Sequence, residues 1–209
     1  MPVGAFLYNY LFFILFSLLF ISAVPKRCGF FAMKGNERMN EKYKVEINPI
    51  DKEEELLEIF REYKPTSYSI TDEGYDWLEN NQSKCIVIKN PYCENDVEIE
   101  LENMDQITLF FADFHTHYFA YQGYYDDMVR TVKSILMNET CSGVIKNLNG
   151  KWFGSTLAEK SEIGKDPQVV FDFIFNIDEF RRNLSENGYK INYCFWDPVD
   201  DSVIVHDKH

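Results

Sequence analysis

The segment at residues 96–102 constrains the fold more strongly than any other part of the chain, because its apolar and acidic side chains alternate without a break. Successive side chains of a β-strand point to opposite faces, so this segment would present one apolar face and one face of carboxylates. The apolar residues are Val97, Ile99 and Leu101, and the acidic residues are Asp96, Glu98, Glu100 and Glu102. The alternation therefore predicts a strand in a sheet that is buried on one side and acidic on the other.

The hydrophobic pattern along the rest of the chain predicts an α+β fold: a single domain with a largely antiparallel sheet, against which two or three helices pack. Asn149-Gly150 separates two apolar runs and predicts a β-hairpin over 142–157, since both residues tolerate positive φ. Residues 169–175 fit either a strand or the beginning of the helix that follows. The other expected strands are 43–47, 85–89, 106–114, 189–196 and 202–206, and the expected helices are 51–63, 71–80, 124–140 and 177–187.

An apolar leader, residues 1–38, precedes the expected domain at 39–209. Its run from residue 3 to residue 24 is long enough to cross a bilayer as a helix. Basic residues follow this run and none precedes it, which is unlike a secretory signal and would leave the following domain in the cytoplasm. Met33 and Met39 are candidate internal starts. An over-extended gene start, a membrane anchor and a cleaved signal all stay open. The first two make the expected location cytoplasmic, with a membrane-anchored domain as the alternative.

The expected domain is more acidic than the whole chain. The formal net charge is −13 overall, whereas residues 39–209 carry 17 basic and 33 acidic side chains, a net charge of −16. A nucleic-acid-binding surface needs basic side chains, so we expect no nucleic-acid partner. Like charges in one row repel each other, and a basic protein would relieve that repulsion. We therefore expect the carboxylates at 96, 98, 100 and 102 to contact a basic partner protein, and a membrane contact only if residues 3–24 are kept as an anchor. The alternative is that these carboxylates form a solvated sheet face with no partner.

Residues 124–127 form a second expected contact surface. The segment contains Tyr124, Tyr125, Asp126 and Asp127 at the beginning of the longest expected helix. Tyrosine is enriched at protein interfaces, so an exposed patch of this composition would suit a partner protein. The alternative is that the tyrosines belong to the core and the aspartates charge the first turn of the helix.

The sequence Asp113-Phe114-His115-Thr116-His117 resembles the Asp-x-His-x-His signature of amidohydrolases and PHP-type phosphoesterases. In those families the two histidines hold a metal ion that activates water. Such a site needs further ligands from later strands, and the only other histidines here are His206 and His209, at the C-terminal end. We therefore expect no catalytic residue, no cofactor and no metal site. Asp113, His115 and His117 remain the candidate ligands if the chain is instead a metal-dependent hydrolase.

The five cysteines form no Cys-x-x-Cys pair, the spacing of zinc knuckles and thioredoxin-type sites. We expect free, buried thiols, as is usual for intracellular chains. A nucleophilic pair of Cys141 or Cys194 with His115 stays open as an alternative, because a sequence cannot show whether a thiol and an imidazole are close.

Four features follow one another along residues 107–152. They are a strand, a His-x-His-Tyr sequence, an acidic helix and a hairpin that contains Lys151-Trp152-Phe153-Gly154. This order, over about a quarter of the chain, resembles small, acidic, uncharacterised bacterial proteins of the immunity-protein type. The resemblance implies a cytoplasmic, non-enzymatic protein that neutralises a toxin by binding it, and it assigns no functional residue. The expected function is that of an acidic interaction protein without catalysis.

Overall fold

The computed structural model describes residues 41–70, 83–102 and 106–208. Over these residues the chain folds as an α+β domain with antiparallel strands and several helices, which confirms the expected fold class. The strands form two sheets, of five and four strands, where one sheet was expected. The leader at 1–38 and the helix expected at 71–80 lie outside the described residues. No helix in the described ranges is both long and apolar enough to cross a membrane.

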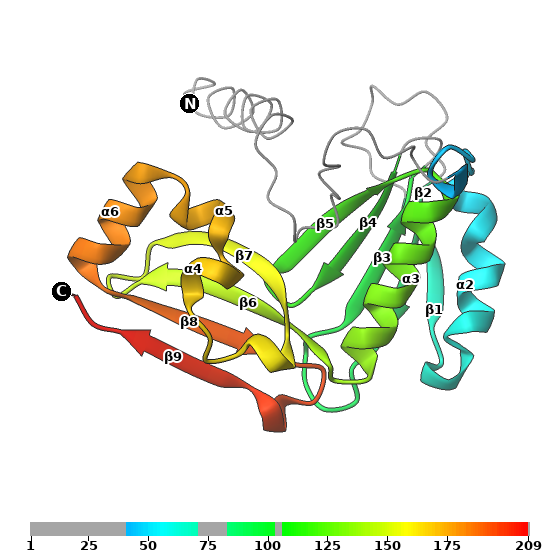
Figure 1. Ribbon diagram of the computed structural model, residues 1–209. Helices are drawn as coiled ribbons and strands as arrows, with labels where there is room; N and C mark the ends of the chain where they lie inside the picture. The colour runs from blue at the N-terminus through cyan, green and yellow to red at the C-terminus, as the bar shows by residue number, and fades with distance from the viewer. Residues whose placement is uncertain (1–40, 71–82, 103–105, 209) are drawn as a thin grey trace, which may run out of the picture.

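The first sheet is a meander of five antiparallel strands in chain order. Its strands are β1 (Thr66–Ile70), β2 (Ser83–Ile88), β3 (Val97–Leu101), β4 (Gln106–Phe111) and β5 (Phe114–Phe119). The helices α2 (Glu53–Ile59) and α3 (Gln122–Leu136) both lie on one side of this sheet (Figure 1). The strands and helices meet in a core of fully buried aliphatic side chains, which includes Ile99, Leu109 and Val132.

The second sheet has four antiparallel strands in the order β7-β6-β8-β9. They are β6 (Thr140–Asn147), β7 (Trp152–Glu159), β8 (Tyr189–Cys194) and β9 (Ser202–His206). The helices α4 (Pro167–Val170), α5 (Asp172–Phe175) and α6 (Asp178–Asn187) pack on one face and enclose a second core. Gly154 lets α5 approach β7, because a Cβ atom there would lie 2.8 Å from Ile174 Cδ1.

Trp196 joins the two halves of the domain. It follows β8 of the second sheet, but its side chain is buried in the core of the first sheet, with its ring centroid 6.5 Å from that of Phe111. The backbone carbonyl of Trp196 also accepts a hydrogen bond of 2.8 Å from Asn90 Nδ2, in the connection between β2 and β3. Leu157 of β7 packs against the same core. These contacts make the two sheets one folded unit.

The segment expected as one helix at 51–63 forms three short consecutive helices. These are η2 (Pro49–Lys52), α2 and η3 (Arg61–Tyr63), with the regular α-helical backbone ending at Phe60, whose φ and ψ are −103° and 16°. Residues 169–175 do not form a strand, since they belong to α4 and α5 except for Phe171, which joins the two helices. Three further 3-10 turns are η1 (Glu41–Tyr43), η4 (Lys160–Glu162) and η5 (Pro198–Asp200).

One predicted strand is absent, and another is shorter than expected. Residues 43–47 do not form a strand, and only an isolated bridge joins Glu46 to Tyr121. The strand expected at 106–114 ends at Phe111, because Ala112 and Asp113 form a two-residue hairpin turn in which Ala112 has a φ of 50°. The chain then returns as β5, which the sequence pattern did not indicate. The strand β1 was also not expected.

The hairpin around Asn149-Gly150 is confirmed, and it joins β6 to β7. Only Gly150 adopts positive φ, at 87°, so the loop is the three-residue type that ends in a left-handed residue. The expected helix at 177–187 is confirmed as α6, which ends at Gly188 with φ of 67°. The last strand pair is confirmed as β8 and β9.

Candidate functional site

The face of the first sheet that points away from α2 and α3, which we call the outer face, brings together predicted site residues from β3 and β5. The register places Cys85, Glu100, Thr108 and His117 in one row across the strands, and Val87, Glu98, Phe110 and His115 in the next row. The other members are Thr66, Tyr68, Ile70, Ser83, Glu102, Gln106 and Phe119. One sheet face therefore carries three of the four expected carboxylates and both histidines.

The carboxylates of the outer face have no basic counterpart from the sheet itself. The only Lys or Arg within the described strands β1–β5 is Lys84, which points to the opposite face, where its Nζ lies 3.2 Å from Glu53 Oε2. Burial, followed by the charges of Glu102 and Glu98, raises the pKa of Glu100 above its ordinary range. The carboxylates on the outer face therefore repel one another, and this repulsion destabilises the folded sheet.

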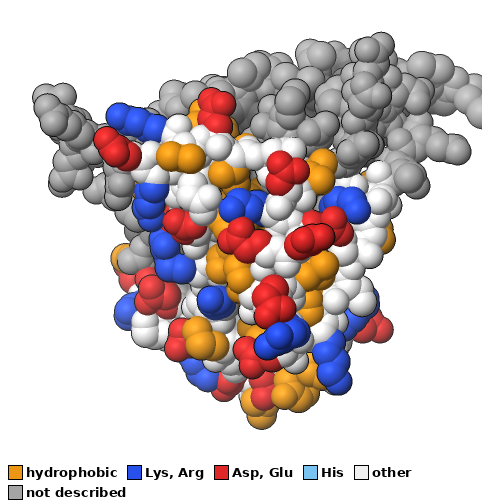
Figure 2. Space-filling view, turned by 90° about the vertical axis from the view of Figure 1, so that its right-hand side faces the viewer, with side chains coloured by type: hydrophobic (Ala, Val, Ile, Leu, Met, Phe, Trp, Pro, Cys, Tyr) orange, Lys and Arg blue, Asp and Glu red, His pale blue; other side chains and the backbone are white. Residues whose placement is uncertain are grey.

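The helix-bearing side of the same sheet has a different charge pattern. Basic and acidic side chains are interspersed over it (Figure 2). On α2 and its neighbours, Lys52 Nζ lies 2.8 Å from Glu55 Oε2, and Arg61 Nη1 lies 3.0 Å from Glu58 Oε1. A row of carboxylates without basic neighbours is therefore particular to the outer face and does not follow from the acidic composition of the chain as a whole.

Asp96 differs from the other three carboxylates. It lies just before β3, and its side chain is 15% exposed. One carboxylate oxygen accepts a hydrogen bond of 2.9 Å from the Asn90 backbone N–H, and the other lies 2.5 Å from Lys89 Nζ. This carboxylate closes the connection between β2 and β3 and is already neutralised, so we remove it from the predicted partner-binding set.

His115 and His117 lie on one face of β5, with ring centroids 5.5 Å apart. Thr108 Oγ1 lies 3.0 Å from His117 Nδ1 and donates to Glu102 Oε1 at 3.4 Å. A hydroxyl has one proton to donate, so when it goes to Glu102, Nδ1 of His117 is the protonated nitrogen. Burial, followed by the charge of His115, lowers the pKa of His117 and favours its neutral form. Glu102, Gln106, Thr108 and His117 therefore form a connected polar network.

Asp113 lies apart from this network, in the turn between β4 and β5. Its position follows from the turn at Ala112, which separates it from the strand that carries His115 and His117. Among the residues that the structure describes, no three His, Cys, Asp or Glu side chains are grouped so that they could hold a metal ion. The two histidines thus have no third ligand beside them in the described ranges.

The candidate nucleophilic thiols are in environments that oppose ionisation. Burial raises the pKa of Cys141 to about 12, and its Sγ donates to the Ala158 carbonyl at 3.4 Å. Burial also raises the pKa of Cys194, and the charges of Asp201 and Asp113 add to this effect. The thiolate is the nucleophilic form of cysteine, so neither thiol is activated for attack.

The expected patch at the beginning of α3 divides into buried and accessible residues. Tyr125 is 2% exposed and belongs to the first core, and Asp127 is 8% exposed. The Asp127 carboxylate accepts a hydrogen bond of 2.9 Å from the Tyr43 hydroxyl and pairs with Arg130. The prediction of an exposed patch was therefore wrong for Tyr125 and Asp127. Asp126 accepts a hydrogen bond of 2.7 Å from Gln122 Nε2.

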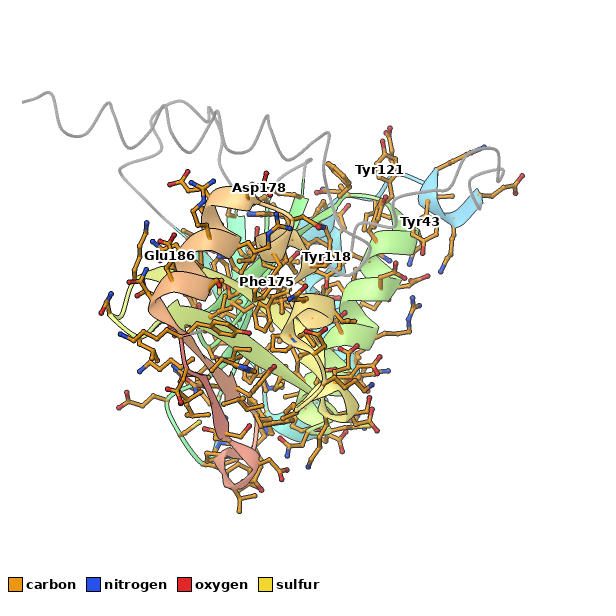
Figure 3. All side chains as sticks on the ribbon, turned by 60° about the vertical axis from the view of Figure 1, so that its left-hand side comes forward. Tyr43, Tyr118, Tyr121, Phe175, Asp178 and Glu186 are labelled. Carbon is orange, nitrogen blue, oxygen red and sulfur yellow. The ribbon has the colours of Figure 1, made fainter. Side chains whose placement is uncertain are left out.

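Tyr124 is the centre of an aromatic cluster, which we define as Tyr43, Phe119, Tyr121 and Tyr124. The ring centroid of Tyr124 lies 5.0 Å from that of Tyr43, 5.7 Å from that of Phe119 and 6.4 Å from that of Tyr121. Figure 3 shows Tyr43 and Tyr121 at this end of α3. Phe119 is 48% exposed and also belongs to the outer face, so the cluster extends that face toward the beginning of α3.

Sequence reasoning missed Tyr43, Phe119 and Tyr121 as members of the site, as well as Thr108. Phe119 and Thr108 are recognisable only once β5 is known to pair with β4. Tyr43 comes from 76 positions earlier in the chain than Phe119 and meets the cluster through the backbone contact of Ile47 N–H with the Ala120 carbonyl. No local periodicity signals either contact.

No protein-family model, no curated protein and no solved structure matches this chain at a significant level. Its function is therefore inferred from the chemistry of the outer face and the aromatic cluster.

Proposed function

We propose that this chain is a non-enzymatic acidic interaction protein that binds a basic partner protein through the outer face and the aromatic cluster. Within that class we propose an immunity protein, which neutralises a toxin by binding it. The resemblance of residues 107–152 to proteins of the immunity type supports the narrower assignment. Most of those residues form β4, β5 and α3, which contribute to the proposed binding surface.

The observation that carries the proposal is the row of half-buried carboxylates, Glu98, Glu100 and Glu102, with no Lys or Arg from the described strands on the same face. Three like charges in neighbouring positions destabilise the folded sheet. Lysine or arginine side chains of a partner would remove that cost on binding. Electrostatic attraction would also raise the rate at which a basic partner associates.

The aromatic cluster suits the same kind of partner. Phe119 lies opposite Gln106, whose Nε2 donates to Glu102, and its ring contacts that of Tyr124. An arginine side chain can stack on an aromatic ring while its guanidinium pairs with a carboxylate. Aromatic residues are also the commonest anchors of protein interfaces. A partner rich in arginine would therefore use both parts of the surface.

The proposal places the domain in the cytoplasm, where an immunity protein meets its toxin. If residues 3–24 are kept as an anchor, the domain would be held at the cytoplasmic side of a membrane. Detection of the N-terminus of the intact protein by mass spectrometry would separate these two locations from a cleaved signal.

Co-expression with basic secreted proteins encoded beside its gene tests the proposed function. The expected result is that one of them is toxic alone, is tolerated together with this chain, and binds the purified chain in calorimetry. A triple variant, Glu98→Gln, Glu100→Gln and Glu102→Gln, should lose both protection and binding. Failure of the unmodified chain to bind and to protect against each such protein would contradict the proposal.

The matched control is the triple variant Asp178→Asn, Glu179→Gln and Glu186→Gln. It changes the net charge by the same amount, but its residues are exposed on α6, which packs on the second sheet; Figure 3 labels Asp178 and Glu186 on this helix. This control should keep protection and affinity. Equal losses in both variants would show that total charge, and not the outer face, drives binding.

A further inference from the structure

The strand β9 forms one edge of the second sheet. It pairs with β8 and with no other strand in the described part of the chain, so alternate backbone N–H and C=O groups point away from the sheet. β9 also runs along the rim of the molecule (Figure 1). Natural proteins commonly protect such an edge with lysine, proline or a β-bulge. The sequence Ser202–His206 has no lysine or proline, and its register with β8 is regular.

The edge is apolar on the side that faces away from α4, α5 and α6. Val203 is 61% exposed and Val205 is 55% exposed on this side. Ile204, between them, points to the other side and packs against the second core. An unprotected strand with two exposed valines is a template for a further strand.

The helix-facing side of β9 carries two unsatisfied polar atoms. Ser202 Oγ and His206 Nε2 are buried and have no hydrogen-bond partner among the described residues. The imidazole of His206 stacks on the ring of Tyr189, with centroids 4.5 Å apart, which fixes its position at the end of the strand. Buried polar groups are usually hydrogen-bonded, so two such atoms on one edge strand indicate missing partners.

We propose that β9 pairs antiparallel with β9 of a second copy of this chain, around a two-fold axis at Ile204. In this register Val203 lies opposite Val205 of the second copy, and Ser202 lies opposite His206 of the second copy. Side chains directly opposite each other have Cβ atoms about 4.5–5.5 Å apart.

The strand is self-complementary, as a two-fold interface requires. Its residue types run polar, valine, isoleucine, valine, polar in both directions, and it contains no Asp, Glu, Lys or Arg. Asp201, just before the strand, turns its carboxylate back to accept a hydrogen bond of 2.7 Å from the Phe195 N–H. The five paired residues therefore bring no like charges together. Just outside them, the register places Asp201 opposite Asp207 of the second copy, and the hydrogen bond to Phe195 holds the Asp201 carboxylate back toward its own chain. The pairing joins two four-stranded sheets into one continuous sheet.

The dimer is expected to be weak. A pair of five-residue strands buries much less than the roughly 1,200–2,000 Å² of a standard protein interface. The two copies should accordingly associate only as the concentration rises. The pairing leaves the outer face of the first sheet free, so it is independent of the proposed partner binding.

Analytical ultracentrifugation of the full chain over a wide range of concentration tests the proposal. The unmodified chain should show a reversible monomer–dimer equilibrium, and Val205→Lys should remain a monomer because it places a charge at the centre of the apolar edge. Val169→Lys is the matched control, since Val169 is 49% exposed on α4. It should dimerise like the unmodified chain. A chain that is monomeric throughout, or a dimer that persists in Val205→Lys, would overturn the proposal.

A second experiment tests the register directly. Val203→Cys and Val205→Cys chains are mixed, oxidised mildly and mapped by mass spectrometry. The expected product is a disulfide between position 203 of one chain and position 205 of the other, in clear excess over the 2:1:1 ratio that random pairing of equal amounts of the two chains would give. A random ratio of the three products, or their absence, would overturn the two-fold register even if a dimer forms.

Discussion

Gly123, in the first turn of α3, shows how one small residue allows a distant segment to pack. A Cβ atom at this position would lie 2.4 Å from Cδ1 of Tyr43, so only glycine admits the Tyr43 ring. The ring in turn contacts Tyr124, and its hydroxyl donates to the buried Asp127 carboxylate. The residues before α2 are therefore fastened to α3 at this point.

We expect Gly123→Ala to destabilise the fold by about 1–3 kcal/mol, because the added methyl group overpacks the Tyr43 ring. This sign is the reverse of the usual effect, since alanine normally stabilises a helix relative to glycine. Urea unfolding measures the change, with Lys133→Ala at an exposed position of α3 as the control. A Gly123→Ala protein as stable as the unmodified chain would contradict the packing described.

A second residue-scale prediction concerns Glu100. Its pKa is raised in the folded state, so proton binding favours folding: this stability is fully present below 4.5, the ordinary value for glutamate, and is lost as the pH rises from there through the raised value. Glu100→Gln imitates the protonated form and should increase the free energy of unfolding at neutral pH. The difference should fade as the pH falls through the raised value and should be gone below 4.5. Glu54→Gln, at an exposed position of α2, should show no such gain when both variants are unfolded across this pH range.

Residue-scale prediction from the sequence succeeded for Glu98, Glu100 and Glu102 because alternation alone determines the face of a strand. The prediction of exposure failed for Tyr125 and Asp127, although helical periodicity indicates that position 125 is buried. Position 125 lies three and seven residues before Met128 and Val132, which makes it part of the buried stripe.

At the scale of elements, the connection of β6 to β7 depends on one left-handed residue. Gly150 has a φ of 87° and no heavy atom within 4 Å of the position where a Cβ would lie, so the requirement for glycine comes from the backbone and not from crowding. Gly150→Ala should therefore cost about 1–2 kcal/mol in thermal or urea unfolding. Asn149→Ala should cost less, since Asn149 does not have positive φ. Equal costs would show that the hairpin uses a different turn.

Local signals identified most of the elements but not all of their ends. Asn149-Gly150 and Gly188 are recognisable because glycine supplies conformations that other residues avoid. Ala112-Asp113 carries no comparable signal, so the turn into β5 was not predicted. That one turn sets the register that places His117 beside Thr108, and with it much of the candidate site.

At the scale of the whole molecule, Asn90 links the two sheets. Its Nδ2 donates to the carbonyl oxygens of Trp196 and Asn95, at 2.8 and 3.2 Å, and its Oδ1 accepts from the Tyr92 N–H at 2.9 Å. Asn90→Ala leaves these buried groups unpaired and should cost about 1–3 kcal/mol.

The unfolding of the Asn90→Ala protein is followed by tryptophan fluorescence and by circular dichroism. Both probes should report one shared transition, as for a single cooperative domain. Asn149→Ala, which removes only an exposed amide contact with Asn187, is the control and should change little. Separate transitions in the unmodified chain would show that the two sheets fold independently.

The fold class followed from composition and alternating patterns, whereas the division into two sheets did not. Nothing local distinguishes a strand that joins the first sheet from one that joins the second. Trp196 illustrates the difficulty, since it directly follows a strand of one sheet and is buried in the core of the other.

The position of Trp196 also bears on how the protein emerges from the ribosome. Among the described residues, every other side chain in the first core comes from Ile47 to Leu136 or, at the margin, from Leu157. A nascent chain that has released only the first sheet and α3 still lacks the indole that closes this core. The first core can therefore exclude water completely only after Trp196, which follows β8, has been synthesised and released.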